Sequence, residues 1–303
     1  MLKHSRKTEI IYQVYPVSFK DSSGDGQGDL RGIFEKLDYI AALHVDAVWI
    51  SPFFLSPAGP DGDGGYAISD YRQIDPQFGT MEDFQALLEK AHDLNLRIYI
   101  DFVVPHTATS HEWFEKSRRR EAPYTDFYTW HDGRKDAKGQ HVPPNNWKSV
   151  FGGDAWTWDD RRGQYYLHHF LASQPALNHN NPEVRVATMT EMAFWLDMGV
   201  DGFRIDALPF ATHDPELRDN PWLPDTCEDT GGWRDQYFEY SVCQPGTLKL
   251  VEDMRKLFDR YDRPITALGE AICGREGGRN SVPIAAGYVD RESGLSMCYT
   301  DAL

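Results

Sequence analysis

Two charged side chains, Arg204 and Asp206, stand two positions apart in an apolar segment that reads Gly-Val-Asp-Gly-Phe-Arg-Ile-Asp-Ala over residues 199–207. Successive side chains of a β-strand point to opposite faces, so these two would share one face. An arginine beside a carboxylate favours the ionised form, which a nucleophile in covalent sugar transfer requires. The alternative is a structural ion pair at the end of a strand, and this motif alone does not separate the two.

A second carboxylate, Glu270, follows the next apolar strand in Ala-Leu-Gly-Glu-Ala. Carboxylates at neighbouring strand ends of a parallel barrel can face one cleft, which suits a retaining glycosidase with carboxyl groups about 5 Å apart. In such a site Asp206 attacks the anomeric carbon, while Glu270 protonates the leaving oxygen and then deprotonates water. A carboxylate that interacts with a helix dipole is the structural alternative for Glu270.

Short apolar strands alternate with amphipathic helical stretches, and this pattern predicts a parallel sheet with crossover helices. The expected strands are 10–15, 47–51, 97–104, 202–208, 265–271 and 295–299, and the expected helices are 32–43, 81–94, 183–198 and 247–259.

The connection from residue 106 to about 181 is too long for a βα loop, so we expect an inserted small domain. An insertion after the third strand fits a (β/α)8 TIM barrel, whose active site lies at the C-terminal ends of the strands. A doubly wound open sheet is the alternative. It is disfavoured because no strand is followed by a Gly-x-Gly-x-x-Gly turn.

Other polar side chains are expected at the same rim of the barrel. His106 follows the third strand and can donate a hydrogen bond to a sugar hydroxyl; a structural histidine is the alternative. Asp63 and Tyr66 lie in a glycine-rich loop after the second strand. A carboxylate with an aromatic ring can hold a pyranose by hydrogen bonds and stacking, although the glycines also fit a simple surface turn.

A different kind of site is predicted after the first strand, where oxygen ligands alternate around a tight glycine turn as in a calcium loop. The candidate ligands are Asp21, Ser23, Asp25, Gln27 and Asp29. The second half of an EF-hand is absent, so a metal-free acidic turn is the alternative. We expect a structural Ca²⁺ ion here and no organic cofactor.

The formal net charge of -16 speaks against nucleic acid or an anionic membrane as a partner, because both require basic patches. No segment approaches transmembrane length, and the residues before the first strand do not form a signal peptide. The cysteines are widely spaced and typical of reduced thiols, which favours a cytoplasmic protein. They are Cys227, Cys243, Cys273 and Cys298.

Together these motifs resemble the alpha-amylase family of retaining glycoside hydrolases (glycoside hydrolase family 13), in its oligo-1,6-glucosidase and alpha-glucosidase branch. The resemblance extends from residue 11 to about 300. It is carried by the ordered segments 15–19, 21–29, 66–71, 75–80, 106–107, 111–114, 144–147, 165–168, 174–178, 202–206 and 269–270.

The resemblance implies a barrel formed by residues 1–106 and 182–303, with domain B at 107–181. It implies Asp206 as nucleophile and Glu270 as general acid/base. Around the terminal glucose it implies Asp63, Tyr66, His106 and Arg204, and at the cation it implies the five loop ligands named above. An alanine at position 207, where some members carry valine, favours alpha-1,4 bonds.

The chain also departs from the family pattern. Ser23 replaces a usual asparagine, Pro105 precedes the histidine in place of asparagine, and Ala67 and Ala176 replace aspartates. Family members carry a third catalytic acidic residue after strand seven, whereas only about six barrel strands are predicted here. We therefore expect an N-terminal part of a longer enzyme.

The expected activity is that of an exo-acting alpha-glucosidase that releases glucose from short alpha-glucosides. A transglycosylase or sugar isomerase, such as trehalose synthase or sucrose isomerase, is a second possibility, since a sugar hydroxyl can replace water. An inactive barrel that serves as a binding module is a third. The oligomeric state is not indicated by the sequence.

Overall fold

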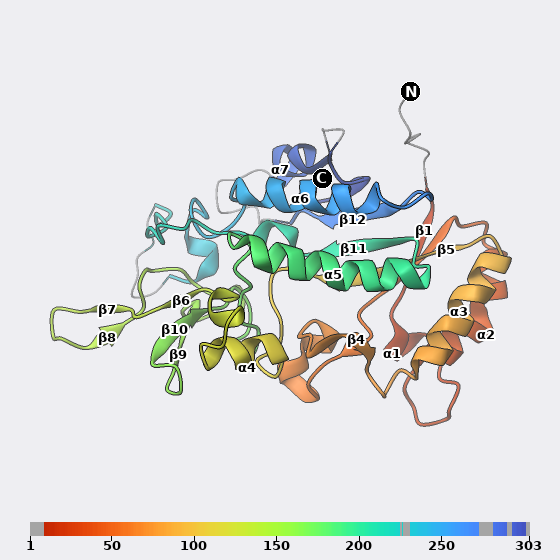
Figure 1. The fold of residues 1–303 in the computed structure, drawn as a ribbon, viewed down its shortest axis with the longest axis horizontal. Helices are drawn as coiled ribbons and strands as arrows, with labels where there is room; N and C mark the ends of the chain where they lie inside the picture. Colours follow the sequence, from red (N-terminus) through yellow and green to blue (C-terminus); the bar gives the residue numbers. More distant parts are fainter. Residues whose placement is uncertain (1–8, 225, 227–230, 273–280, 290–292, 301–303) are drawn as a thin grey trace.

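A computed structural model describes residues 9–224, 226, 231–272, 281–289 and 293–300 (Figure 1). Six parallel strands form its central sheet in the order β1-β2-β5-β11-β12-β13, curled as half of a barrel. They are β1 (Ile11–Val14), β2 (Ala47–Ile50), β5 (Arg97–Val103), β11 (Gly202–Asp206), β12 (Thr266–Glu270) and β13 (Met297–Tyr299). All six strands expected from the sequence are confirmed, as is the alpha-amylase type of TIM-barrel fold.

The centre of this sheet is formed by β5 and β11, which are buried almost throughout. Gly202 begins β11 where a Cβ atom would meet the carbonyl oxygen of Thr266 at 2.2 Å, so only glycine permits the close approach of β12. The register then places Arg204 opposite Asp101 on one side and Leu268 on the other. This register decides which charged groups meet at the strand ends.

The four expected crossover helices begin and end close to their expected positions. They are α2 (Leu30–Ala41), α3 (Met81–Asp93), α5 (Pro182–Met198) and α6 (Gly246–Phe258). A further helix, α7 (Ser281–Val289), was not expected from the sequence. A capping box joins Thr80 and Asp83 at the start of α3. The α2 helix begins two residues before the expected Gly32, because the Asp29 side chain accepts a hydrogen bond from the Gly32 N–H and caps the helix.

The long connection between β5 and α5 forms a separate layer, drawn in yellow and green at one end of the molecule (Figure 1). It contains α4 (Glu112–Arg118), η2 (Tyr124–Asp126) and an antiparallel sheet ordered β6-β10-β9. The strands of this sheet are β6 (Trp130–His131), β9 (Trp156–Asp159) and β10 (Gln164–Leu167), while β7 (Arg134–Lys135) and β8 (His141–Val142) pair as a separate two-stranded sheet. The connection thus contains its own helix and strands, and its assignment as a domain with limits at 107 and 181 stays a prediction.

Short elements complete the rim around the strand ends. They are α1 (Pro16–Phe19), β3 (Phe54–Leu55), η1 (Gly59–Gly65), β4 (Asp70–Ile74), η3 (Leu208–Phe210) and η4 (Trp233–Asp235). Among the described helices, none has the length and apolarity needed to cross a bilayer. Cys298 is a free cysteine. Cys227 and Cys273 lie outside the described residues.

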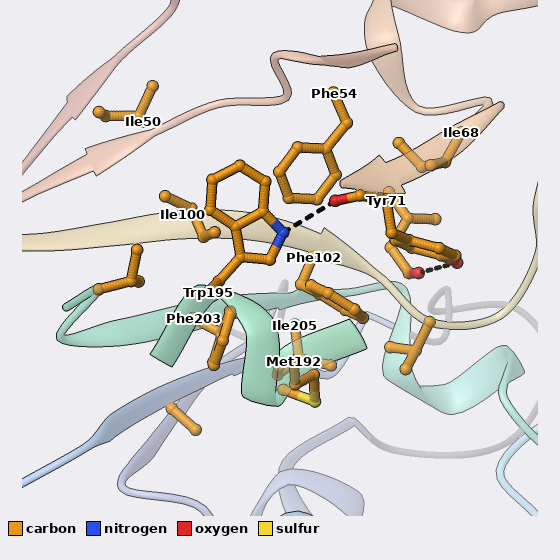
Figure 2. Packing of buried hydrophobic residues seen from close by; sticks show 14 of the residues in the cluster. Ile50, Phe54, Ile68, Tyr71, Ile100, Phe102, Met192, Trp195, Phe203 and Ile205 are labelled. Atoms are coloured by element: carbon orange, nitrogen blue, oxygen red, sulfur yellow. Dashed lines mark hydrogen bonds between the residues drawn. The ribbon is translucent and has the colours of Figure 1, made fainter. Parts of the chain in front are cut away.

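The core between α5 and the sheet centres on Trp195, which is fully buried (Figure 2). Its ring stacks on Phe54 with centroids 4.9 Å apart, and its indole N–H donates to the Tyr71 carbonyl at 2.8 Å. Tyr71 in turn stacks on Phe102 of β5 at 5.1 Å and donates its hydroxyl to the Val103 carbonyl. This core therefore fixes the position of β5 relative to α5 and to β4, which carries Tyr71.

Replacing Trp195 with alanine should lower the free energy of unfolding by about 3–5 kcal/mol, because it leaves a large cavity and an unpaired Tyr71 carbonyl. Urea unfolding followed by circular dichroism measures this loss. Val186→Ala, on the exposed side of the same helix, is the control and should change stability by less than about 0.5 kcal/mol. Similar losses in both variants would contradict this description of the core.

Candidate active site

A single buried guanidinium, that of Arg204, organises the C-terminal ends of four parallel strands. Its Nη1 donates to Asp206 Oδ1 at 2.5 Å and to Asp101 Oδ1 at 2.8 Å. Its Nη2 donates to Glu270 Oε2 at 2.7 Å, and its Nε donates to the Tyr299 hydroxyl at 3.0 Å. These partners come from β11, β5, β12 and β13 respectively, so one side chain ties the strands together where the sheet meets the pocket.

The two carboxylates predicted to react, Asp206 and Glu270, are thus held by neighbouring nitrogens of one guanidinium. Glu270 Oε2 also accepts the backbone N–H of Ala207 at 2.9 Å. Ala207 adopts a left-handed backbone conformation, with φ 42° and ψ 39°, directly after the strand ends. This turn directs its N–H towards β12, and so places Glu270 beside Asp206 across one cleft.

The site holds more negative than positive charge, because Asp101, Asp206 and Glu270 surround one arginine. Burial raises the pKa of Asp101 to about 6, although the Arg204 guanidinium and the Trp49 N–H favour its anion. Burial likewise raises the pKa of Asp206 above its usual range, and Arg204 opposes the rise. The ionised form of Asp206 therefore depends on its contact with Arg204.

All six residues predicted to act at a sugar site line one pocket of about 750 Å³. They are Asp63, Tyr66, His106, Arg204, Asp206 and Glu270. Asp63 has a left-handed backbone, with φ 46°, and its Oδ2 accepts a hydrogen bond from Gln174 Nε2 at 3.0 Å. Burial raises the pKa of Asp63, and the Gln174 N–H opposes the rise. The structure brings these residues together, while their roles towards a sugar stay predictions.

His106 differs from expectation in its hydrogen bonding. The ring is buried, and burial lowers its pKa to about 4, so the imidazole is neutral near pH 7. Its Nε2 lies 3.0 Å from the Tyr66 carbonyl, which can only accept, so Nε2 carries the proton. In this arrangement the His106 N–H donates to the Tyr66 carbonyl, whereas a sugar hydroxyl was its expected acceptor. The remaining nitrogen, Nδ1, is buried, has no hydrogen-bond partner among the described residues, and can only accept.

Four residues of the site were not identified from the sequence: Trp49, Asp101, Gln174 and Tyr299. Asp101 and Tyr299 bind Arg204 across the strands, Trp49 donates to Asp101 at 3.1 Å, and Gln174 holds Asp63. Asp101 stands inside an apolar strand, a position where a buried carboxylate requires a partner. That signal could have indicated its pairing with an arginine.

The carboxylates of the predicted calcium loop accept hydrogen bonds from nearby backbone N–H groups. Asp21 accepts backbone N–H groups of Gly24 and Gly26, and Asp29 accepts Ser22 and Gly32. In the described part of the chain, no three His, Cys, Asp or Glu side chains are grouped as metal ligands. Carboxylate and carbonyl oxygens are ligands that suit Ca²⁺, but in this loop the described carboxylates are not grouped around one point. The proposed sugar chemistry does not depend on the ion.

Replacing Arg204 with methionine should lower the free energy of unfolding by about 3–5 kcal/mol at pH 8, since it leaves buried carboxylates without a counter-charge. Carboxyl groups with a raised folded-state pKa favour folding at low pH, and this contribution disappears as pH rises through that pKa. The loss should therefore shrink at pH 5, below the value of about 6 for Asp101. Urea unfolding at the two pH values measures the difference.

The control for this experiment is Arg119→Met, which breaks a surface pair with Glu121. An exposed pair contributes at most about 1 kcal/mol, so this variant should behave alike at both pH values. An Arg204→Met loss that does not change between pH 5 and pH 8 would argue against charge compensation as the function of this arginine.

Comparison with known proteins supports the same description. Residues 13–289 match the family model "Alpha amylase, catalytic domain". A probable alpha-glucosidase of Rhizobium meliloti (strain 1021) is 45% identical over 297 residues, which are 96% of this chain and 52% of that protein. The human amino acid transporter heavy chain SLC3A1 is 43% identical over 256 residues, which are 83% of this chain and 36% of that protein.

Among solved structures, the alpha-glucosyl transfer enzyme XgtA superimposes with a TM-score of 0.86 and 48% identity, over 96% of this chain and 53% of that one. The chain thus spans about half the length of the alpha-glucosidase and of XgtA. Because the family match covers most of the sequence and the arrangement of strands agrees with it, the chain belongs to the alpha-amylase family.

Proposed function

We propose that this chain carries the catalytic site of a retaining alpha-glucosidase that hydrolyses terminal alpha-glucosidic bonds of disaccharides or short oligosaccharides. The main support is that Asp206 and Glu270 lie on either side of one guanidinium, in a pocket that also contains Asp63 and Tyr66. Similarity to the probable alpha-glucosidase of Rhizobium meliloti agrees with this proposal.

In the proposed first step, Asp206 attacks the anomeric carbon of the bound glucose, and the bond from that carbon to the leaving oxygen breaks. Glu270 gives its proton to the leaving oxygen. In the second step, Glu270 removes a proton from water, whose oxygen attacks the same carbon and releases Asp206. Arg204 contributes by holding both carboxylates and by keeping Asp206 ionised.

Hydrolysis of p-nitrophenyl alpha-glucoside by the 303-residue chain tests this proposal. Asp206→Asn should lower kcat/KM by about a thousandfold or more, because no nucleophile remains. Glu270→Gln should impair maltose hydrolysis more than nitrophenyl glucoside hydrolysis, because nitrophenolate leaves without a proton donor. Asp160→Asn, on the exposed surface, should have no effect. The first sugar released should be alpha-glucose, as observed by proton NMR.

A folded chain that hydrolyses no alpha-glucoside would contradict the proposal, as would beta-glucose as the first product. The former outcome would favour a binding module. The similarity to the amino acid transporter heavy chain SLC3A1 agrees with that alternative. The presence of both carboxylates at the guanidinium speaks for catalysis.

Glucosyl transfer to another hydroxyl is the second candidate, and the similarity to XgtA, described as an alpha-glucosyl transfer enzyme, supports it. Its chemistry shares the first step and differs only in the molecule that Glu270 deprotonates. A preference for alpha-1,4 bonds is also part of the proposal, on the basis of the alanine at position 207. Product analysis with maltose and sucrose distinguishes hydrolysis from transfer.

We further propose a structural Ca²⁺ ion in the loop after β1, held by Asp21, Ser23, Asp25, the Gln27 carbonyl and Asp29. Hydrogen bonds from Gly24 and Gly26 lower the pKa of Asp21, so an anionic oxygen is available there at neutral pH. Calcium at a hundred times its dissociation constant should add about 2.7 kcal/mol to the unfolding free energy. Thermal unfolding in calcium and in EDTA measures this, and equal midpoints would contradict the site.

The net charge of -16 supports the proposal that the chain has neither nucleic acid nor an anionic membrane as a partner. A cytoplasmic location stays part of the proposal. A small alpha-glucoside is the proposed ligand of the pocket.

A further inference from the structure

The pocket is lined by two chemically different groups of side chains. One group is the carboxylates, Arg204 and His106 described above. The other is a set of aromatic side chains, which meets the first group where the Phe170 ring lies 5.2 Å from the His106 ring. We call these residues the aromatic wall, and they are Phe151, Phe170, Phe210, Trp233 and Phe238.

The rings of the aromatic wall contact one another in an unbroken series. Phe151 lies 6.0 Å from Phe170, and Phe170 lies 4.9 Å from Phe210, measured between ring centroids. Phe210 stacks on Trp233 at 6.2 Å, and Trp233 stacks on Phe238 at 4.3 Å with an interplanar angle of 15°. Rings arranged in this way form one continuous apolar surface.

The aromatic wall starts beside the predicted acid/base. Ala207, whose N–H binds Glu270, also accepts the Phe210 N–H at 2.9 Å in the same turn. Glu270 is the group that protonates the leaving oxygen or deprotonates the attacking one. Because Glu270 and these rings line the same pocket, a substituent on that oxygen can extend from Glu270 along the aromatic wall.

The pocket offers few hydrogen-bond partners to a sugar that lies on the aromatic wall. The other described lining residues are Tyr15, Val150, Ala207, Arg234 and Ile272, and of these Tyr15 and Arg234 have polar side-chain groups. A second glucose unit carries hydroxyl groups around its ring, and each hydroxyl that loses water without a new partner is unfavourable by about 1–3 kcal/mol. An alcohol with an aromatic or alkyl group loses nothing there and covers the rings.

We propose that the aromatic wall is the binding site for the leaving group and the acceptor, and that it selects an aromatic or apolar alcohol over a sugar. The inference rests on the proposed retaining mechanism. In transfer, the hydroxyl oxygen of the alcohol forms a bond to the anomeric carbon while the ester bond to Asp206 breaks. The proton of that hydroxyl goes to Glu270, and the product is an aryl or alkyl alpha-glucoside.

The first test uses alpha-glucosyl fluoride as donor, because fluoride is too small to need the aromatic wall. Benzyl alcohol and glucose are offered together at equal concentration, and products are separated by chromatography. Benzyl alpha-glucoside should exceed disaccharide by about tenfold, which corresponds to one well-covered ring. Disaccharide as the main product would overturn the inference and leave the hydrolytic proposal intact.

Two variants assign the preference to the aromatic wall. Phe151 is 56% exposed at the rim, so Phe151→Ala should fold, and Trp233→Leu preserves an apolar side chain. Each should lower the ratio of benzyl alpha-glucoside to disaccharide by about three- to tenfold. The matched controls are Tyr39→Ala and Trp158→Leu, which replace exposed aromatic residues outside the pocket. An unchanged ratio in both wall variants would overturn the inference.

Binding supplies a second readout that requires no turnover. Calorimetry with phenyl alpha-glucoside and methyl alpha-glucoside on the Asp206→Asn chain compares the same sugar with and without a ring. The phenyl compound should bind about tenfold more tightly, and Phe151→Ala should reduce that advantage. Equal affinities would overturn the inference. Failure to cleave glucosyl fluoride, with the binding difference present, would instead count against the proposed catalytic function.

Discussion

The contact of one buried arginine with three carboxylates is the constraint on which the upper part of this sheet depends. Asp101, Asp206 and Glu270 would each be unfavourable in this buried cluster alone, and Arg204 is the positive charge bonded to all three. Since the carboxylates belong to three neighbouring strands, charge compensation also fixes the relative heights of those strands. Stability and the placement of the reacting groups therefore have the same physical origin.

Much of the fold was predictable because it is encoded in local patterns. Apolar strands between amphipathic helices indicated six parallel strands, and strand ends indicated where Asp206 and Glu270 stand. The pairing partners of Arg204 were not predictable in the same way, because they depend on register. Asp101 lies opposite Arg204, and Tyr299 lies opposite Glu270, through the alignment of separate strands. No pattern within a single strand specifies that alignment.

The pocket shows a similar division between local and distant information. A long insertion was evident from the sequence, but the aromatic wall joins Phe151 and Phe170 of that insertion to Phe210 and Trp233, which follow β11. Aromatic residues lie in a protein core more often than in a ligand site, so composition alone favoured a role in the core. Only the contact between two distant loops turns these rings into one surface beside Glu270.

Ala207 follows the predicted nucleophile in a left-handed conformation that non-glycine residues rarely adopt. A β-branched side chain would add strain to this conformation. Rotating the peptide to relieve that strain would also turn the Ala207 N–H away from Glu270. The size and branching of one side chain are therefore coupled, through the backbone, to the hydrogen bonding of the acid/base. A correlation between this position and bond preference therefore has a conformational contribution, since a residue that lines the pocket also sets the hydrogen bonding of the proton donor.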